Sequence, residues 1–328
     1  MPRCNFKSWL CMENILCIGE LLIDFICSDV NATMIQGENF KKKAGGAPAN
    51  VTAAICKLGG KASFVGKVGN DPFGEFLKKT LDDVNVDTSM MIMDPSSNTT
   101  LAFVSLKSDG ERDFVFNRGA DGLLKYNELD TNKIFSNKII HFGSATALLG
   151  GEMKETYLSI MGEARDKGIF VSFDPNYRGN LWGNRTEEFI RVSKQCIEMA
   201  DFIKLSDEEL NIITGKTDVY EGIKELSNKG NKIVAVTLGK QGTLISNGVT
   251  TEIIDSIKIK SIDSTGAGDA FVGALLYKIS LLENPKKLCS DFEELKNIVY
   301  FANKVGAIVC TKLGAIAALP SLAEVENI

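Results

Sequence analysis

The sequence predicts an α/β fold in which helices cover both faces of a doubly wound, mostly parallel sheet. From residue 138 onward, apolar strand-like runs alternate with segments of helical spacing. The run that opens at Ile15 is apolar without polar alternation, which is typical of a strand buried on both faces. A hairpin-like segment, 99–117, interrupts the alternation and predicts a small sheet outside the main one.

The composition excludes several classes of protein. The chain has 328 residues, of which 44% are hydrophobic and 24% charged, as in ordinary globular proteins. The net charge of -5, without a long basic run, argues against nucleic acid as the main ligand. No apolar stretch is long enough to span a membrane. Eight scattered cysteines favour reduced thiols in a cytoplasmic protein over disulfides or a metal site. With the single histidine His141, Ser-His-Asp and His-rich metal chemistry are nearly excluded, and we expect His141 at a strand end rather than in catalysis.

Residues 1–13 are expected to form a disordered extension, and one domain is expected over residues 14–328. The loop Gly45-Gly46-Ala47-Pro48-Ala49-Asn50 leads into a helix, and it favours either a small polar ligand or a plain strand-to-helix turn. The hairpin, with a turn at 108–111, is a candidate lid. Strands are predicted at 62–69, 138–143, 169–174, 201–205, 232–238 and 257–262, and helices at 51–58, 75–83, 152–167, 187–199, 207–213, 220–229, 270–282 and 292–310.

The stretch Asp263-Ser264-Thr265-Gly266-Ala267-Gly268-Asp269 stands between a strand-like run and an apolar helical run. The first turn of a helix offers unpartnered amides and partial positive charge, and small residues let a phosphate approach the backbone. A carboxylate beside a phosphate site repels the phosphate, so the presence of Asp269 there needs a functional reason. We interpret Asp269 as a general base that takes a proton from an attacking hydroxyl. A role limited to stabilising the helix dipole is the alternative.

Four residues are predicted at or just beyond strand ends, where ligands bind to open parallel sheets: Asp24, Asp174, Gly239 and Asp269. The sequence has no Gly-x-Gly-x-x-Gly after the first strand and no Gly-x-x-x-x-Gly-Lys-Ser/Thr loop. A phosphate site therefore has to come from the turn at 266–268.

The motifs resemble those of PfkB or ribokinase-like carbohydrate kinases over about residues 15–320. One signature is Gly45–Asn50 followed by Gly69-Asn70-Asp71-Pro72-Phe73-Gly74, and the other is the run 263–271. The resemblance implies ATP-dependent phosphorylation of a sugar hydroxyl, with ATP, Mg²⁺ and K⁺ as cofactors. It also implies a discontinuous lid from residues 25–44 and 98–118, through which two copies of the chain could form a homodimer.

The resemblance implies a role for each matching residue. Catalysis is expected from Asp269 as the base and from an anion hole of Gly266, Ala267 and Gly268. Sugar binding is expected from Asp24, Gly45, Gly46, Asn50, Phe103, Arg118 and Arg178. ATP is expected to contact Lys204, Glu209, Thr237, Gly239, Gly242 and Asn303, with Ser206 standing where the family usually has Asn. Asp263, Thr265, Val309, Lys312 and Gly314 resemble a K⁺ site built mostly from backbone oxygens.

Two segments favour fructose as the sugar. The run 116–121 resembles the motif that follows the lid in fructokinases, and the run 174–182 resembles a segment that fructokinases share with 2-keto-3-deoxygluconate kinases. Kinases of acid sugars usually carry a Tyr-rich stretch before the position of Arg118, where this chain has Phe116 and Asn117. Arg118 could also simply pair with Asp121 on the surface. An acid sugar, ribose or a nucleoside stay open as substrates. A sugar-binding regulator without kinase chemistry and a flavodoxin-like binding domain stay open as other classes.

Overall fold

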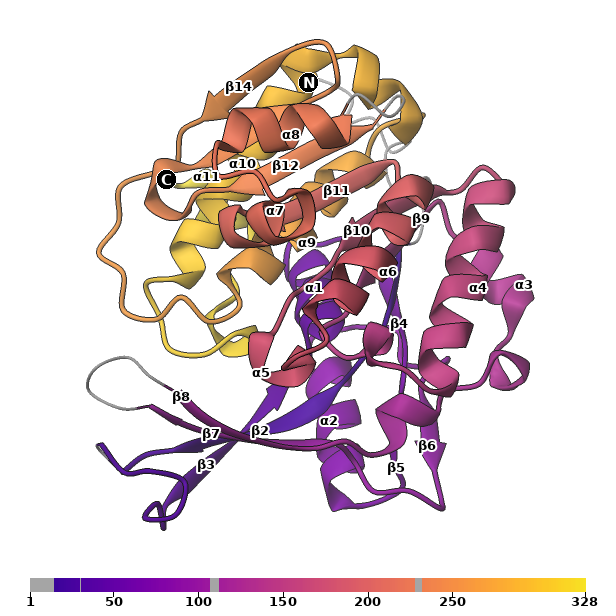
Figure 1. Ribbon diagram of the computed structural model, residues 1–328, viewed down its shortest axis with the longest axis vertical. Coiled ribbons are helices and arrows are strands. Elements are labelled where there is room, and N and C mark those ends of the chain that lie inside the picture. The colour runs from indigo at the N-terminus through magenta and orange to yellow at the C-terminus, as the bar shows by residue number, and fades with distance from the viewer. Residues whose placement is uncertain (1–14, 30, 107–111, 228–231) are drawn as a thin grey trace, which may run out of the picture.

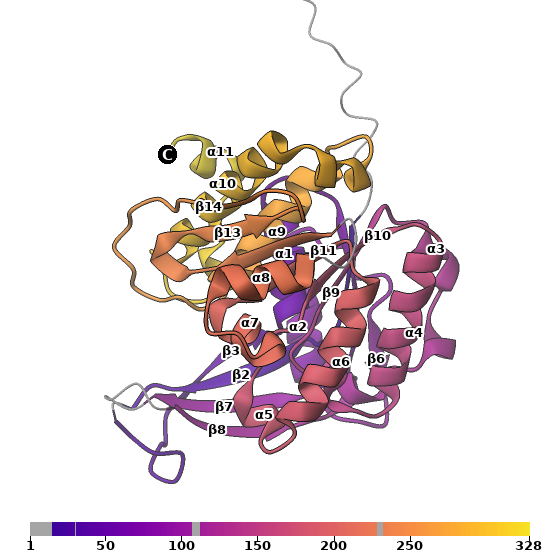
Figure 2. The ribbon, with the colours of Figure 1, turned by 45° about the horizontal axis from the view of Figure 1, so that its top comes forward.

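The computed structural model describes residues 15–29, 31–106, 112–227 and 232–328. The predicted N-terminal extension, 1–13, and the predicted hairpin turn, 108–111, lie outside the described residues. The described chain forms a large α/β body with a smaller sheet projecting from one end (Figures 1 and 2). None of its helices is both long enough and apolar enough to cross a bilayer.

The main sheet of the described residues has the strand order β14-β13-β12-β11-β10-β9-β1-β4. Neighbours from β12 to β4 run parallel, and β13 and β14 are added antiparallel at one edge. The strands are β1 Ile15–Ile18, β4 Ala62–Val65, β9 Ile139–Gly143, β10 Phe170–Asp174, β11 Phe202–Ser206, β12 Ile233–Thr237, β13 Thr243–Ser246 and β14 Thr251–Ile254. The predicted doubly wound, mostly parallel sheet is confirmed.

The helices of the described residues are α1 Ala47–Lys57, α2 Pro72–Asp82, α3 Thr131–Phe135, α4 Glu152–Asp166, α5 Gly179–Trp182, α6 Thr186–Met199, α7 Asp207–Thr214, α8 Val219–Ser227, α9 Ala267–Ser280, α10 Phe292–Val309 and α11 Leu322–Glu326. Short 3₁₀ turns, η1 to η6, lie at Ala120–Leu123, Tyr126–Glu128, Ala147–Leu149, Gly239–Gln241, Pro285–Ser290 and Ile316–Ala318. Local sequence sets several of these boundaries. Asp71 caps α2 ahead of Pro72, and Gly215, with φ 71°, ends α7 in the left-handed region.

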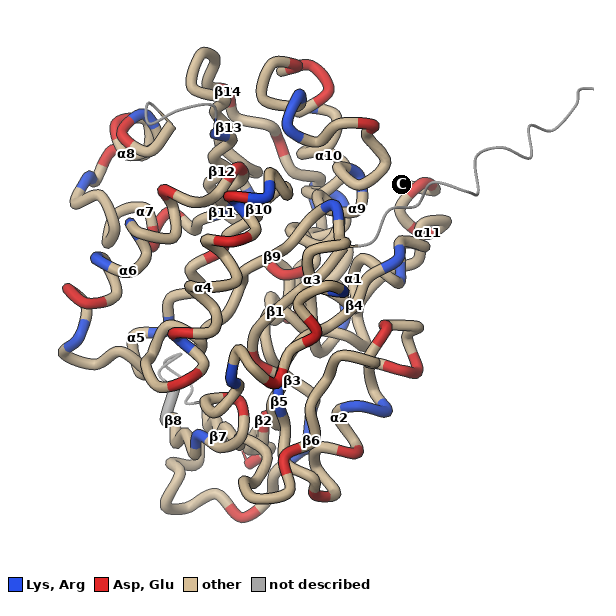
Figure 3. The backbone as a smooth tube through the Cα atoms, turned by 90° about the vertical axis from the view of Figure 1, so that its right-hand side faces the viewer, with Lys and Arg blue, Asp and Glu red and all other residues tan. Residues whose placement is uncertain are grey.

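Alternate residues of β1 pack into different cores, as a strand buried on both faces requires. Ile15 and Cys17 join the core beneath α1, α9 and α10, whereas Leu16 and Ile18 join the core beneath α4, α6, α7 and α8. In Figure 3 the backbone positions of basic residues (blue) and acidic residues (red) are interspersed along α2, α4, α6 and α8.

The lid sheet has the strand order β3-β2-β7-β8, with β2 Leu22–Cys27, β3 Phe40–Gly45, β7 Leu101–Leu106 and β8 Arg112–Asn117. β7 and β8 pair antiparallel, which confirms the predicted hairpin. The prediction that Asp24 ends a strand of the main sheet is wrong. The chain leaves that sheet at Gly19, where a side chain would collide with Pro48 and Ser144, and Asp24 is the third residue of β2.

Other boundaries also differ from the predictions. The predicted strand 62–69 is divided into β4 and β5, Lys67–Gly69, which pairs with an unpredicted β6, Ile92–Asp94. The predicted strand 257–262 is irregular, because its alternating isoleucines find no sheet to pack on and Ile262 stays 63% exposed. A backbone hydrogen bond of 2.8 Å from Ile262 to the Cys310 carbonyl holds it instead. The antiparallel edge strands β13 and β14 were not predicted.

His141 lies in the middle of β9, not at a strand end, and it is fully buried. Its Nδ1 lies 2.9 Å from the Ser172 hydroxyl on the neighbouring strand. Burial lowers the pKa of His141 to about 3, and the positive charge of Lys204 lowers it further. The only imidazole in the chain is therefore neutral at physiological pH.

Candidate active site

The start of α9 faces the carboxyl ends of the central strands. Gly266 caps the helix in a left-handed conformation, with φ 77°, and a side chain there would lie 2.6 Å from Ala315 Cβ. A Cβ placed on Gly268 would lie 3.4 Å from Nζ of Lys204, on β11. The Lys204 ammonium therefore lies beside the first turn of α9, where the helix dipole already favours an anion. One of the three predicted anion-hole amides, Ala267 N–H, is donated within the turn, to the Ser264 carbonyl at 3.2 Å.

Lys204 forms a buried ion pair with Asp174 at the end of β10, with 3.0 Å between Nζ and Oδ2. Burial alone would lower the pKa of Lys204, but the charges of Asp174, Glu209 and Asp269 outweigh it and raise the pKa above the ordinary value. The lysine is therefore cationic at neutral pH. Asp174 was expected near the site from its strand end but was not assigned a role; this ion pair gives it the role of holding Lys204.

Asp269 lies in the first turn of α9, and its Oδ2 accepts a 2.8 Å hydrogen bond from Nδ2 of Asn50 on α1. Burial raises the pKa of Asp269, and Asp174 raises it further, against the hydrogen bond from Asn50 and the charges of Arg178 and Lys204. A carboxylate with a raised pKa is a stronger base toward a hydroxyl. Within the described residues, Oδ1 of Asn50 is buried and has no hydrogen-bond partner, so it is able to accept from a ligand hydroxyl.

Asp24 and Gly45 meet across the β2–β3 pair. A side chain on Gly45 would collide with Oδ2 of Asp24, and a Cβ on Gly46, which has φ 113°, would lie 2.4 Å from the Glu20 carbonyl oxygen. Burial raises the pKa of Asp24 to about 6, although the Arg178 charge lowers it. The charge of Arg178 lowers the pKa of both Asp24 and Asp269, so Arg178 acts electrostatically on a carboxylate of the lid and on one of the body.

The lid adds an aromatic cluster to this space. Phe103 on β7 stacks on Phe25 of β2 with centroids 5.1 Å apart, and Phe40 packs edge-on against it at 5.9 Å. Phe25 in turn meets Phe73 of α2 at 5.7 Å. Such a cluster gives the lid an apolar surface able to cover the ring carbons of a ligand.

The two predicted arginines differ in their contacts. Arg178 donates to the Tyr177 carbonyl at 2.9 Å and to the Asn176 side-chain oxygen at 3.0 Å, and its charge reaches Asp24 and Asp269. Arg118 instead donates to the carbonyls of two residues in the turn after β9 and forms a 3.5 Å ion pair with Asp121. The predicted pairing with Asp121 is present, but Asp121 is buried and not on the surface.

Ser206 and Glu209 form a capping box at the start of α7. The Ser206 hydroxyl accepts from the Glu209 amide at 3.1 Å, and Oε2 of Glu209 accepts from the Ser206 amide at 2.7 Å. The other Glu209 oxygen accepts from the Tyr177 amide at 2.7 Å, which ties α7 to the segment carrying Arg178. Serine therefore performs the capping that an asparagine would perform at this position.

Lys204 and Glu209 lie on β11 and α7, and the other predicted nucleotide residues lie around β12, β13 and α10. Thr237 ends β12, and Gly239 and Gly242 enclose η4 with φ of 57° and 100°. Asn303 on α10 is buried: it accepts from the Thr243 hydroxyl at 2.7 Å and donates to the carbonyls of Ile254, which ends β14, and of the next residue, Asp255. These hydrogen bonds hold α10 against β13 and the end of β14, and we call this surface the wall of the site.

The predicted K⁺ loop is tied together by Asp263. One Asp263 oxygen accepts from the amide and the hydroxyl of Thr265, at 3.0 and 2.6 Å, and the other accepts from the Gly314 amide at 2.9 Å. The Val309 carbonyl accepts from the Lys312 amide at 3.2 Å. The described part of the chain has no cluster of three or more His, Cys, Asp or Glu side chains suited to a metal.

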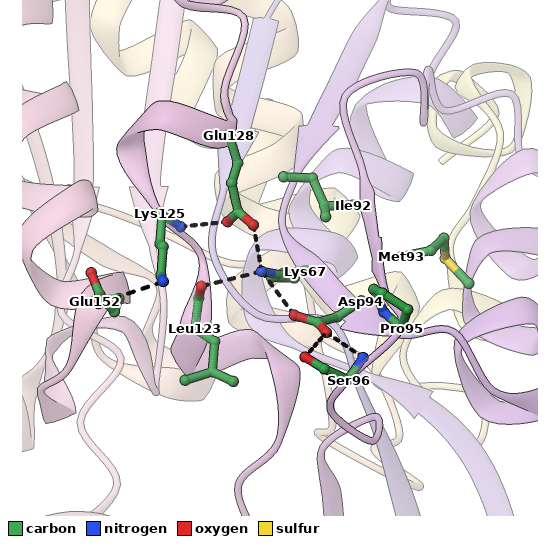
Figure 4. A pocket seen from close by; sticks show the side chains of 10 residues that line it. All are labelled: Lys67, Ile92, Met93, Asp94, Pro95, Ser96, Leu123, Lys125, Glu128 and Glu152. Carbon is green, nitrogen blue, oxygen red and sulfur yellow. Dashed lines mark hydrogen bonds and ion pairs between the residues drawn. The ribbon is translucent and has the colours of Figure 1, made fainter.

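A separate pocket lies beside β5, β6 and η2 (Figure 4). At its centre, the buried Lys67 ammonium binds Asp94 at 2.8 Å, Glu128 at 2.7 Å and the Leu123 carbonyl at 3.3 Å. These contacts use all three N–H groups of the lysine. The pocket's central polar groups satisfy one another, and its residues are distinct from those around Asp269.

Comparisons with known proteins agree with this geometry. The chain matches the model of the pfkB family carbohydrate kinases over residues 12–322. It is 39% identical to Fructokinase-1 of Oryza sativa subsp. japonica and 40% identical to Fructokinase-1 of Zea mays, over 95% of this chain and 96% of each relative. A fructokinase from Xylella fastidiosa with bound ATP superposes with a TM-score of 0.85 at 32% identity, covering 96% of this chain and 97% of that one. A fructokinase from Vibrio cholerae O395 with fructose, ADP and calcium bound superposes with a TM-score of 0.83 at 32% identity, covering 96% and 98%. The chain therefore belongs to the pfkB family of carbohydrate kinases.

Proposed function

We propose that this protein transfers the γ-phosphoryl group of ATP to a hydroxyl of fructose. The observation that carries the proposal is Asp269, whose carboxylate Asn50 orients and which directly follows the turn that Lys204 lies beside. Relatives named fructokinases, at 39–40% identity over nearly the whole chain, support fructose as the acceptor.

In this mechanism Asp269 accepts the proton of a primary hydroxyl, O6 or O1 of the hexose, as that oxygen attacks the γ-phosphorus in line. Lys204 and the amides of Gly266 and Gly268 stabilise the charge on the transferred group, and the small side chain of Ala267 lets that group approach the turn. Asp24, the backbone of Gly45 and Gly46, Asn50 and Arg178 hold the sugar hydroxyls, and Phe103 covers the ring. The closed lid excludes water, which would otherwise compete as acceptor.

ATP fits the strand edge at which Thr237, Gly239 and Gly242 lie, against the wall that Asn303 holds. Mg²⁺, when bound, neutralises the phosphates, and most of its ligands come from phosphate oxygens and water. Glu209 retains lone pairs able to accept from such waters. We assign K⁺ to the loop of Asp263, Thr265, Val309, Lys312 and Gly314, where it would hold the anion-binding turn in shape. Replacing K⁺ by Li⁺ in the assay should then lower turnover without changing fructose affinity.

Two further features belong to this proposal. Exposed Ile26 and Val115 on the lid support a homodimer formed through this sheet, which sedimentation analysis of the purified chain would detect. Arg118, which donates from both terminal nitrogens to backbone carbonyls, is assigned to holding the turn after β9 and not to the sugar. The thiols of Cys17 and Cys196, buried in the cores, suit a reducing compartment, and we propose the cytoplasm.

The decisive experiment measures ADP release with ATP and Mg²⁺ against fructose, 2-keto-3-deoxygluconate, ribose, adenosine, glucose and no sugar. Turnover with fructose far above the others, with a fructose phosphate identified by mass spectrometry, is the expected result. Turnover mainly with the acid sugar would reassign Arg178 to a carboxylate. Sugar binding by calorimetry without any ADP release would mean a sugar-binding regulator.

A further inference from the structure

The lid is attached to the body at a point that we call the lid root, where β7 begins and β8 ends. Thr100, just before β7, donates its hydroxyl to Oδ1 of Asp121 and accepts the Gly119 amide at 2.8 Å. The Ala120 amide donates to the Asn98 carbonyl at 2.9 Å. The two chain segments that carry the lid are thus joined to each other and to the buried Asp121 carboxylate.

The sugar loop, Gly45–Asn50, is held from beneath by Glu20. One Glu20 oxygen accepts the amide of Ala47, the first residue of α1, at 3.0 Å, and also the Ala145 amide at 3.3 Å. The other oxygen accepts the Ser144 hydroxyl. Burial raises the pKa of Glu20 to about 7, and Asp121 also raises it, although the hydrogen bonds lower it. Glu20 was not singled out from the sequence, because it looks like an ordinary polar residue after a strand.

The turn after β9, residues 144–150, connects these two regions. The Ser144 hydroxyl accepts the Thr146 amide at 3.3 Å, and the Thr146 hydroxyl donates to Oδ2 of Asp121 at 2.7 Å. Arg118 clamps the same turn, donating to the Thr146 carbonyl at 2.9 Å and to the Gly150 carbonyl at 3.2 Å. An unbroken path of polar contacts therefore runs from the lid root to the first amide of α1.

We propose that this path fixes the lid root in register with the sugar loop, so that its members are positioning residues for phosphorylation of the sugar; the proposal rests on the function proposed above. The path, here called the lid-root chain, consists of Glu20, Thr100, Asp121, Ser144 and Thr146. Each of these residues is at most 2% exposed. None of them touches the reacting atoms, and each acts through Ala47 or the lid strands.

The position of the chain distinguishes this role from general support of the fold. It links the two elements that bind the sugar and includes none of the residues assigned to ATP. Buried polar networks are held in one arrangement only when every member is satisfied. Removing one hydroxyl should therefore loosen the lid relative to the sugar loop and leave the nucleotide side unchanged.

The test replaces Thr146 by valine, which keeps the shape and removes the hydroxyl, and by serine, which keeps the hydroxyl. The matched control is Thr156→Val on α4, since Thr156 is equally buried and donates its hydroxyl to the Leu124 carbonyl at 2.9 Å. We expect Thr146→Val to raise the fructose KM about tenfold, because a donor to a buried carboxylate is lost. The ATP KM should stay within about twofold, and more ADP should be released per fructose phosphate formed, because the loosened lid admits water.

Thr146→Ser should restore wild-type values, and Thr156→Val should change only the unfolding midpoint. Equal changes in the KM values for fructose and ATP would overturn the proposal. Wild-type KM values and a wild-type ratio of ADP to fructose phosphate in Thr146→Val would also overturn it.

Amide hydrogen exchange gives a readout that does not depend on activity. Exchange in Thr146→Val should rise together at 100–102 and 47–50; a rise confined to 144–150 would also overturn the proposal. A wild-type protein that phosphorylates no sugar would contradict the proposed function, and the exchange result would still decide whether the chain connects the two regions.

Discussion

The side of the site that we propose for the sugar and the side that we propose for the nucleotide are built differently. On the sugar side, Asp24 and Asp269 are carboxyls with raised pKa, and Asn50 retains a buried oxygen without a partner in the described residues. On the nucleotide side, Asn303 has both ends of its amide bound to protein groups, and glycine turns shape the surface. On the proposed sugar side, polar side chains keep atoms that are free to bind a ligand or a proton. On the proposed nucleotide side, the amide of Asn303 is fully hydrogen-bonded within the protein and contributes only to the shape of the surface.

The largest test of this contrast is Asp269→Asn. The amide keeps the shape but cannot accept a proton, so kcat should fall by about 10²- to 10⁴-fold while ATP binding is retained. Glu187→Gln, which changes an exposed acid in the first turn of α6, controls for loss of a dipole-stabilising charge. Steady-state kinetics and nucleotide calorimetry measure both quantities. Unchanged turnover in Asp269→Asn would leave this residue with only the dipole role.

Gly45→Ala should have the next largest effect, confined to the sugar side. Its methyl group would collide with Oδ2 of Asp24, so the lid strand must shift and the fructose KM should rise by about 10- to 100-fold. Gly162→Ala on α4 is the matched control, because its nearest side-chain neighbour, Met199 Sδ, is 4.0 Å away. That control should keep wild-type kinetics and gain slightly in thermal stability. If Gly45→Ala raised the ATP KM as much as the fructose KM, its effect would not be confined to the sugar side and the prediction would be wrong.

Asp24→Asn should weaken fructose binding and stabilise the folded protein. Burial raises the pKa of Asp24 from its ordinary value of 3.8 to about 6, so ionised Asp24 destabilises the folded state above pH 6 and this cost vanishes below about pH 4. The variant should therefore be about 3 kcal/mol more stable than wild type at pH 8 and about equally stable at pH 4. Urea unfolding at the two pH values measures the difference, and fructose binding should weaken. A variant less stable than wild type at pH 8 would show that the carboxylate is well paired.

Asn303→Ala should have the smallest effect on activity. It removes hydrogen bonds to Thr243, Ile254 and Asp255, so stability should fall by about 2 kcal/mol. Since Asn303 acts on the shape of the wall, the ATP KM should rise by about threefold at most and the fructose KM should not change. Thermal unfolding and kinetics with each substrate varied separately would measure this. If Asn303→Ala lost much of its ATP affinity but kept the stability of the wild type, Asn303 would instead contact the adenine of ATP directly.

Local signals were sufficient for much of the fold. The apolar run at Ile15, the small residues at 266–268 and the glycine after α7 act through their immediate neighbours, and the structure has the expected elements at these places. Asp24 was misplaced because Gly19 breaks a continuous apolar run, and only contacts with Pro48 and Ser144 reveal why. The lid-root chain could not be predicted at all, since it joins residues up to about 125 positions apart through buried hydroxyls.

The burial of the only histidine makes the pH dependence of this kinase easier to interpret. With the His141 pKa lowered to about 3, no imidazole titrates between pH 5 and 8, the interval in which histidine ordinarily complicates kinetic profiles. The carboxyls of Asp24 and Glu20, with pKa values of about 6 and 7, titrate in that interval instead. Comparing rate profiles of the wild type and Asp24→Asn in that interval therefore tests the contribution of the Asp24 carboxyl without interference from an imidazole.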